Sequence, residues 1–123
     1  MEILHRRDGI FSKKIEGTEV TYHLFDEFEV HENEVPPGTI QSWHHHDIIE
    51  EILYIISGSM KAHWKDGGKE FKEKVRRGDV IRVGNLPHNF VNTSNRTCRF
   101  VVFRFVPTGE SKKDLIKNDK ILD

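Results

Sequence analysis

The chain has 123 residues, of which 36% are hydrophobic and 32% charged, and these values predict one soluble domain with a small core. Its 19 basic and 20 acidic side chains leave a net charge of -1, so charge gives no reason to expect a nucleic-acid or membrane partner. The single cysteine, Cys98, excludes an internal disulfide and, without an apolar signal segment at the N-terminus, suggests a cytoplasmic location.

The first third of the chain is predicted to form an arm followed by two strands. Residues 1–17 carry few apolar side chains and are expected to be an N-terminal arm or a short edge strand. Apolar and polar residues alternate over Thr18–Leu24, and this period of two predicts a strand. A second strand is expected within Phe25–Val35, which ends at the turn signal PPG of residues 36–38.

The middle of the chain is predicted to be rich in strands. We expect strands over Ile40–His46, Glu51–Ile56 and Met60–Lys65. The second of these is apolar on both faces, so we expect it to be central in a sheet or covered by a partner subunit. A DGG sequence at residues 66–68 predicts a hairpin, whose second arm is the highly charged Lys69–Arg77.

The last third is predicted to hold three more strands and a tail. The strands are expected at Val80–Val83, His88–Asn92 and Cys98–Val106. Residues 108–123 are expected to be a C-terminal tail with a short helix that is capped at Ser111. About nine short strands with tight turns therefore predict an all-β barrel or two-sheet sandwich over residues 18–107.

A group of histidines and acids beside the strand-rich middle indicates a metal site. On an extended chain, His44 and His46 point to one side while His45 points away. Glu51 opens the next strand, and a fourth donor is expected from a distant segment, for which His88 is suited. Imidazole nitrogens and a carboxylate oxygen suit divalent transition metals, and this ligand set leaves coordination positions open for a small molecule.

The same stretch resembles the first motif of the cupin family, G(X)5HXH(X)3-4E(X)6G, which Gly38–Gly58 matches at every fixed position. The second motif is G(X)5PXG(X)2H(X)3N. It is matched at Gly78, His88 and Asn92, whereas Gly84 stands where proline is usual and Leu86 where glycine is usual.

The resemblance implies a cupin-type double-stranded β-helix, a jelly-roll barrel, with a short C-terminal helical tail. It implies one divalent metal ion (Mn, Fe, Ni, Co or Zn) held by His44, His46, Glu51 and His88. It also implies a metal-dependent enzyme acting on a small molecule, of oxygenase, isomerase or lyase type. The alternatives are a non-catalytic small-ligand-binding or sensing barrel, and a metal-free or storage-type barrel.

Several other side chains are candidates for the site or its surroundings. Glu50 is a rival to Glu51 as carboxylate ligand, and Glu50, Tyr54 and His63 are candidate acids or bases. A buried arginine could clamp a carboxylate substrate, and the two candidates are Arg82 and Arg104.

The remaining expectations concern the cavity, the surface and assembly. Residues in phase with the ligands are expected to line the cavity, namely Ser42, Phe90, Phe103 and Phe105. Four histidines are expected at the surface or on edge strands, namely His5, His23, His31 and His63. A homodimer is expected because the strand at Glu51–Ile56 is apolar on both faces and edge strands need covering.

Overall fold

The computed structural model describes residues 1–123, and nine strands make up most of its regular structure. The strands are β1 (Ile10–Lys13), β2 (Glu19–Leu24), β3 (Phe28–Val35), β4 (Glu50–Ser57), β5 (Ser59–Asp66), β6 (Lys69–Arg76), β7 (Val80–Arg82), β8 (His88–Val91) and β9 (Cys98–Phe105). A 3-10 turn precedes them at Arg6–Asp8, and one helix, α1 (Lys113–Asn118), follows them. The arm thus contains a short edge strand, β1, which pairs only with β2.

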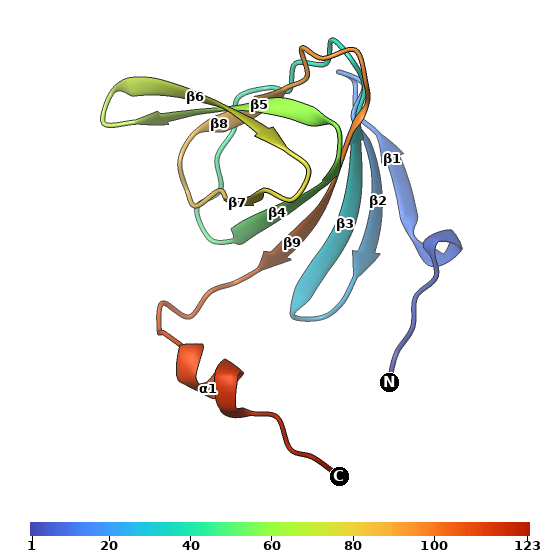
Figure 1. The fold of residues 1–123 in the computed structure, drawn as a ribbon, viewed down its shortest axis with the longest axis vertical. Helices are drawn as coiled ribbons and strands as arrows, with labels where there is room; N and C mark the ends of the chain where they lie inside the picture. Colours follow the sequence, from blue (N-terminus) through green and yellow to red (C-terminus); the bar gives the residue numbers. More distant parts are fainter.

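The strands form two antiparallel sheets that roll into an open barrel (Figure 1). The larger sheet has the order β1-β2-β3-β9-β4-β7, and the smaller has the order β6-β5-β8. The chain passes between the sheets at the tight β4–β5 turn, where Gly58 has a φ of 77°. A Cβ on Gly58 would lie 2.5 Å from the carbonyl oxygen of Thr97, so this crossing requires glycine.

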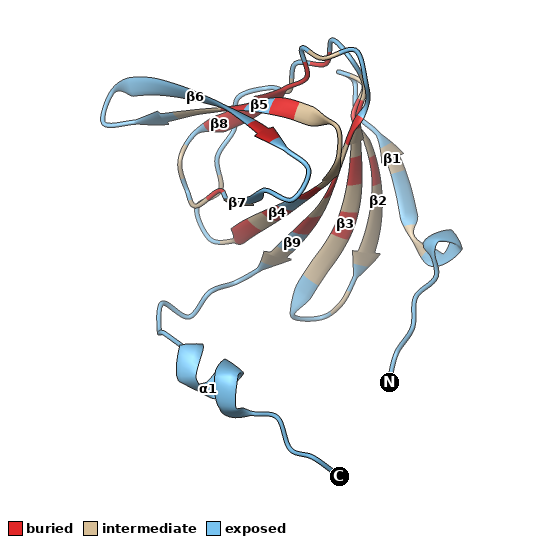
Figure 2. Cartoon of the chain, in the orientation of Figure 1, coloured by how far each residue is buried: buried red, intermediate tan, exposed pale blue.

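The core lies between the two sheets; buried positions alternate along β3 and most of β9, whereas all four residues of β8 are buried (Figure 2). The larger sheet contributes Leu53 and Ile55 from β4 and Phe100 and Val102 from β9, while β5 contributes Met60. Alternation on a strand places every second side chain on one face. The barrel interior therefore holds an apolar core and also buried polar side chains, among them His31, Asn33, Glu51 and His88.

The β5–β6 hairpin forms where the DGG sequence predicts it. Asp66 pairs with Lys69, so Gly67 and Gly68 make a two-residue turn. Both glycines have positive φ values, 56° and 76°, as the tight hairpin turn demands.

The segment Ile40–His46 is not the continuous strand that its sequence predicts. Only Ile40 and His44 form isolated bridges, to Val91 and His88 of β8. The amide of Gln41 bonds the carbonyl of Phe90, and the amide of His44 bonds that of His88. Between the two bridges, residues 41–43 of the segment lie opposite only residues 89 and 90 of β8. One extra residue on one side is the definition of a β-bulge, and it interrupts the ladder.

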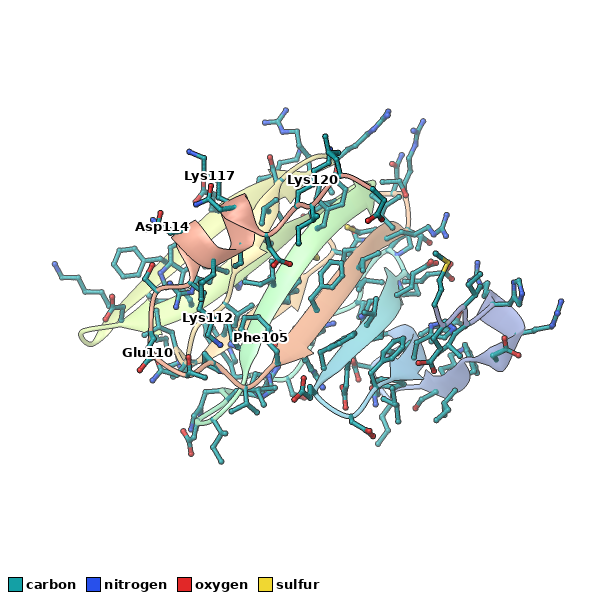
Figure 3. All side chains as sticks on the ribbon, turned by 90° about the horizontal axis from the view of Figure 1, so that it is seen from below. Phe105, Glu110, Lys112, Asp114, Lys117 and Lys120 are labelled. Carbon is teal, nitrogen blue, oxygen red and sulfur yellow. The ribbon has the colours of Figure 1, made fainter.

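The C-terminal tail contains the predicted short helix, but the helix begins at a different cap. Helix α1 begins after Lys112, which makes no side-chain cap, so the predicted cap at Ser111 is wrong. Its apolar Leu115 and Ile116 are exposed. Figure 3 shows the tail with its charged side chains, among them Lys117, beyond the end of β9. No helix in the structure has the length and hydropathy needed to cross a membrane.

Candidate metal centre

Four side chains from three parts of the chain lie close together. They are His44 and His46 of the bulged segment, Glu51 of β4 and His88 at the start of β8. One donor atom from each lies within 4.8 Å of the donor atoms of the others. The backbone bridge between His44 and His88 holds two of the histidines side by side, with ring centroids 4.3 Å apart.

Backbone carbonyls fix the orientation of two of the imidazoles. Nδ1 of His44 lies 2.9 Å from the carbonyl oxygen of Ser42, and Nδ1 of His88 lies 2.8 Å from that of Leu86. A carbonyl oxygen only accepts, so each neutral ring carries its proton on Nδ1 and leaves an unshared electron pair on Nε2. Nε2 of His88 is buried and has no hydrogen-bond partner. Such an orphaned acceptor is what a metal ligand presents.

The carboxylate of Glu51 is buried between an arginine and a histidine. The Nε–H of Arg104 donates to its Oε1 at 2.8 Å, and Nε2 of His46 lies 2.9 Å from its Oε2. Although the His46 contact is short, its alignment is not that of a hydrogen bond. Burial acts to raise the pKa of Glu51, but the charge and hydrogen bond of Arg104, with smaller contributions from His46 and His88, lower this pKa overall. Glu51 is therefore held as the anion, the form that binds metals.

The pKa of His88 is lowered, which keeps its ring in the neutral form that coordinates a cation. Burial is the main cause, the hydrogen bond to Leu86 acts in the opposite direction, and nearby His44 lowers the pKa further. Metal binding at a neutral ring competes less with protons.

The residues present fit a divalent metal ion. Donor atoms on opposite sides of one ion, each bound at about 2.1 Å, would be about 4.2 Å apart. The spread of 4.8 Å among the four donor atoms requires only a small closure of the side chains. Three nitrogens and one oxygen are a suitable set for Mn, Fe, Co, Ni or Zn, and they leave positions free on a five- or six-coordinate ion.

A cavity of about 260 Å³ adjoins the four side chains and is lined by His44 and Glu51 on the side of the centre. Its floor is apolar and includes Leu53, Phe90 and Phe100. Ser42 and Phe90 line this cavity as the sequence predicts. Because the cavity touches two of the four donor residues, a molecule bound in it would lie beside the candidate centre.

The predicted phase of the last strand is wrong. Phe103 and Phe105 are on the outer face of β9 and are 44% and 38% exposed, whereas Phe100, Val102 and Arg104 face inward. The strand is apolar on both faces, so its sequence does not determine which face is the inner one.

His31 is a second residue that the sequence places wrongly. It is neither at the surface nor on an edge strand, since β3 lies between β2 and β9 and His31 is 3% exposed. It lines the cavity together with Asn33, whose side-chain nitrogen contacts Nδ1 of His31 at 3.0 Å. A sequence signal for this inner face exists. The charged Glu32 and Glu34, which are typical of an exposed face, alternate with the uncharged His31 and Asn33.

The other candidate residues lie away from the centre. Glu50 is buried on the opposite side of β4 from Glu51, where it accepts hydrogen bonds from Arg82 and from the amide of Gly84. Tyr54 is 47% exposed on the outer face of the sheet.

Two further histidines are also separate from the four. His45 is exposed, and its Nε2 lies 3.3 Å from Asp47. His63 lines a neighbouring cavity of about 450 Å³ beneath the β5–β6 hairpin, and this second cavity reaches the other side of His88.

Comparisons with known proteins agree with this geometry. Residues 31–104, more than half of the chain, match the family described as Cupin domain. No curated protein matches the sequence.

Several solved structures share the fold at low identity. A mutant of the oxalate decarboxylase of Bacillus subtilis has a TM-score of 0.73 and 20% identity over 88% of this chain and 30% of that chain. An oxalate oxidase has a TM-score of 0.65 and 18% identity over 76% of this chain and 53% of that chain. CENP-C of Drosophila melanogaster bound to CAL1 has a TM-score of 0.71 and 16% identity over 83% of this chain and 84% of that chain.

The present chain spans about a third of the oxalate decarboxylase and about half of the oxalate oxidase. At these identities the likeness concerns the fold, and it confirms the predicted all-β cupin barrel. The match of the family over residues 31–104, the two rolled sheets and the grouping of three histidines with one glutamate together establish that this chain is a member of the cupin family.

Proposed function

We propose that the protein is a metal-dependent enzyme acting on a small molecule, with a divalent ion held by His44, His46, Glu51 and His88. The observation that carries this proposal is the convergence of their four donor atoms within 4.8 Å beside a cavity of about 260 Å³. When bound, such an ion supplies a Lewis acid with open positions for substrate oxygens. Oxygenase, isomerase and lyase chemistry are each compatible with this arrangement.

The protein's own residues supply orientation and lower the local polarity. The carbonyls of Ser42 and Leu86 direct two imidazoles toward a common point, and Arg104 holds Glu51 in its charged form. The apolar side chains among the cavity's lining residues lower the local polarity, which strengthens electrostatic interactions there. The cavity, at about 260 Å³, is slightly smaller than most ligand pockets, which measure about 300–1,000 Å³. It therefore suits a small ligand.

A non-catalytic ligand-binding or sensing barrel is the second candidate. One observation favours it: two of the candidate acids or bases lie away from the centre, Glu50 on the opposite side of β4 and Tyr54 on the outer face of the sheet. CENP-C, a barrel of similar extent, was solved bound to another protein. Turnover of a small molecule by the metal-loaded protein would distinguish the two functions.

The metal assignment can be tested by elemental analysis of untagged protein purified without added metal. His44→Ala and His88→Ala should each reduce the bound metal from about one ion per chain to a small fraction, because each removes one of four ligands. His45→Ala is the matched control, since His45 lies between two of the proposed ligands but is exposed and contacts Asp47. If the His44 and His88 variants retain as much metal as the His45 variant, the assignment is wrong.

We also infer a homodimer in a reducing, cytoplasmic compartment. The outer face of the larger sheet exposes large apolar side chains, including Tyr54, Val80 and Phe103. The single Cys98 is buried and has no second cysteine to pair with, so the fold uses no disulfide, as is usual in reducing compartments.

A further inference from the structure

The cavity beside the candidate centre contains a polar pair that the metal assignment does not use. His31 and Asn33 are successive inward-facing residues of β3 and are 3% and 7% exposed. Asn33 Nδ2 donates to Nδ1 of His31 at 3.0 Å, so the neutral ring carries its proton on Nε2. That Nε2 is buried and has no hydrogen-bond partner. Buried donors are rarely left unpaired, so a missing acceptor is indicated.

The register of the sheet places His31 near Arg104 and Glu51. His31 pairs with Val102, and on β9 the next inward-facing residue is Arg104, which pairs with Glu51. His31 is therefore a diagonal neighbour of the arginine that holds the candidate ligand Glu51. Because Nδ1 faces Asn33, Nε2 lies on the other side of the ring. His31, Arg104 and Glu51 line the same cavity.

The charges around the cavity favour an anion once a divalent ion is present. Arg104 and Lys14 offset Glu16 and Glu51 among the lining residues. A divalent cation then leaves the cavity with an uncompensated positive charge. The His31 ring does not add to that charge, because burial, and next the charge of Arg104, lower its pKa to about 4. It can therefore act near neutral pH as an uncharged donor.

We propose that His31 donates its Nε2 hydrogen to one oxygen of a small carboxylate whose other oxygen faces the candidate metal centre. This proposal rests on the proposed function, since the metal supplies the charge that favours the anion. The cavity volume of about 260 Å³ favours a short molecule. His31 is thus a specificity-determining residue rather than a metal ligand.

Two substitutions of His31 separate its donor from its packing role. His31→Gln places an amide nitrogen near the position of Nε2, whereas His31→Asn keeps a polar group near Asn33 but does not reach that position. We would load each protein with Co²⁺ and measure binding of oxalate, malonate and acetate by titration calorimetry. The visible absorption of the bound cobalt would report changes at the ion. Malonamide and inorganic phosphate serve as ligand controls.

The expected result is that His31→Gln binds at least one carboxylate with nearly the parent affinity, whereas His31→Asn binds it about ten- to a hundredfold more weakly, as for a lost hydrogen bond to a charged acceptor. All three proteins should bind equal amounts of cobalt, malonamide should bind weakly, and phosphate should not compete. Equal carboxylate affinity in the Asn variant, or equal binding of phosphate, would overturn the proposal. So would loss of cobalt from the Asn variant alone, because His31 would then support the metal.

Failure of the proposed function would look different. The parent itself would bind no cobalt at this site, and His44→Ala would not change the amount of cobalt bound. Carboxylate binding of equal strength with and without cobalt would also overturn the His31 proposal, because the metal's charge would then have no part in recognition. Thermal melting of each variant identifies any that has lost its fold, and retained binding by the Gln variant excludes a general effect of altering β3.

Discussion

Two arginines make the same kind of contact with two adjacent acids. Only the contact of Arg104 faces the cavity beside the candidate centre. Arg104 Nε donates to Glu51 at 2.8 Å, and Arg82 Nε donates to Glu50 at 2.9 Å. Glu50 and Glu51 are both buried, and they project to opposite faces of β4. The arginine next to Glu51 therefore controls the charge of a candidate ligand, whereas the other one serves the fold.

Arg104→Gln should weaken metal binding by about ten- to a hundredfold, the range found when an outer partner of a ligand is lost. Without the guanidinium, burial raises the pKa of Glu51, so protons compete with the metal for the carboxylate. Arg82→Gln removes an equivalent contact from Glu50 and should leave metal affinity within about threefold of the parent. Competition with a chromophoric chelator at pH 7 measures all three proteins. Equal affinities in the two variants would contradict a role for Arg104 at the centre.

His31 makes the stability of the metal-free protein depend on pH. Its pKa is about 4 in the folded state and 6.5 for an unperturbed histidine. Between these values the unfolded chain binds a proton that the folded protein does not, so acidification lowers the free energy of unfolding. The expected loss from His31 is about 2 kcal/mol between pH 7 and pH 5.

Urea unfolding in the presence of a chelator measures this dependence for the parent and for His31→Gln, which has no titratable group at that position. The variant should lose about 2 kcal/mol less than the parent over the same pH range. Because the other histidines are common to both proteins, their contributions cancel. Parallel pH profiles would show that His31 does not have its pKa lowered by the fold.

At the scale of elements, alternation and turn chemistry predict most of the barrel. The strand at Glu51–Ile56 and the hairpin at residues 66–68 follow directly from β-branched residues and paired glycines. The grouping of four side chains was also predictable, because the first motif places two histidines on one face of an extended chain and a glutamate at the start of the next strand. Their role as metal ligands is a proposal that elemental analysis tests.

The elements that were predicted wrongly share a physical cause. The local pattern of apolar and polar residues does not determine which strands a segment pairs with or which of its faces is the inner one. Ile40–His46 alternates like a strand, but between its two bridges to β8 it has one residue more than β8, so only isolated bridges form. Strand β9 is apolar on both faces, so alternation cannot reveal that Phe103 faces outward. His31 carries no apolar signal at all, and its burial depends on β2 and β9 flanking it.

At the scale of the whole molecule, the outer face of the larger sheet is the strongest feature for assembly. Tyr54 pairs with Val101 and Val80, and Phe103 pairs with the adjacent Ile52. Tyr54, Val80 and Phe103 are 47%, 65% and 44% exposed. Contiguous apolar surface of this kind marks interaction sites in soluble proteins, and a two-fold pairing of this face would cover it on both chains.

Size-exclusion chromatography with light scattering should therefore give the mass of a dimer at micromolar concentration. Phe103→Glu should shift the protein to a monomer, because it would place a charge at the centre of the covered face. Phe11→Glu, on the edge strand β1 at the far side of the sheet, is a matched control and should remain dimeric. A monomeric parent protein would contradict the proposed assembly.

The two layers of the barrel each contribute to the candidate centre, and this division has a mechanical consequence. Glu51 is the second residue of β4 in the six-stranded sheet, and His88 is the first residue of β8 in the three-stranded sheet. A cation bound by both would hold the two sheets together at the candidate centre, in addition to the covalent crossing at Gly58. Without the ion, this region would keep the backbone hydrogen bonds between His44 and His88 but would lose the link to Glu51. The metal-bound and metal-free forms should therefore differ most in how often this region opens locally.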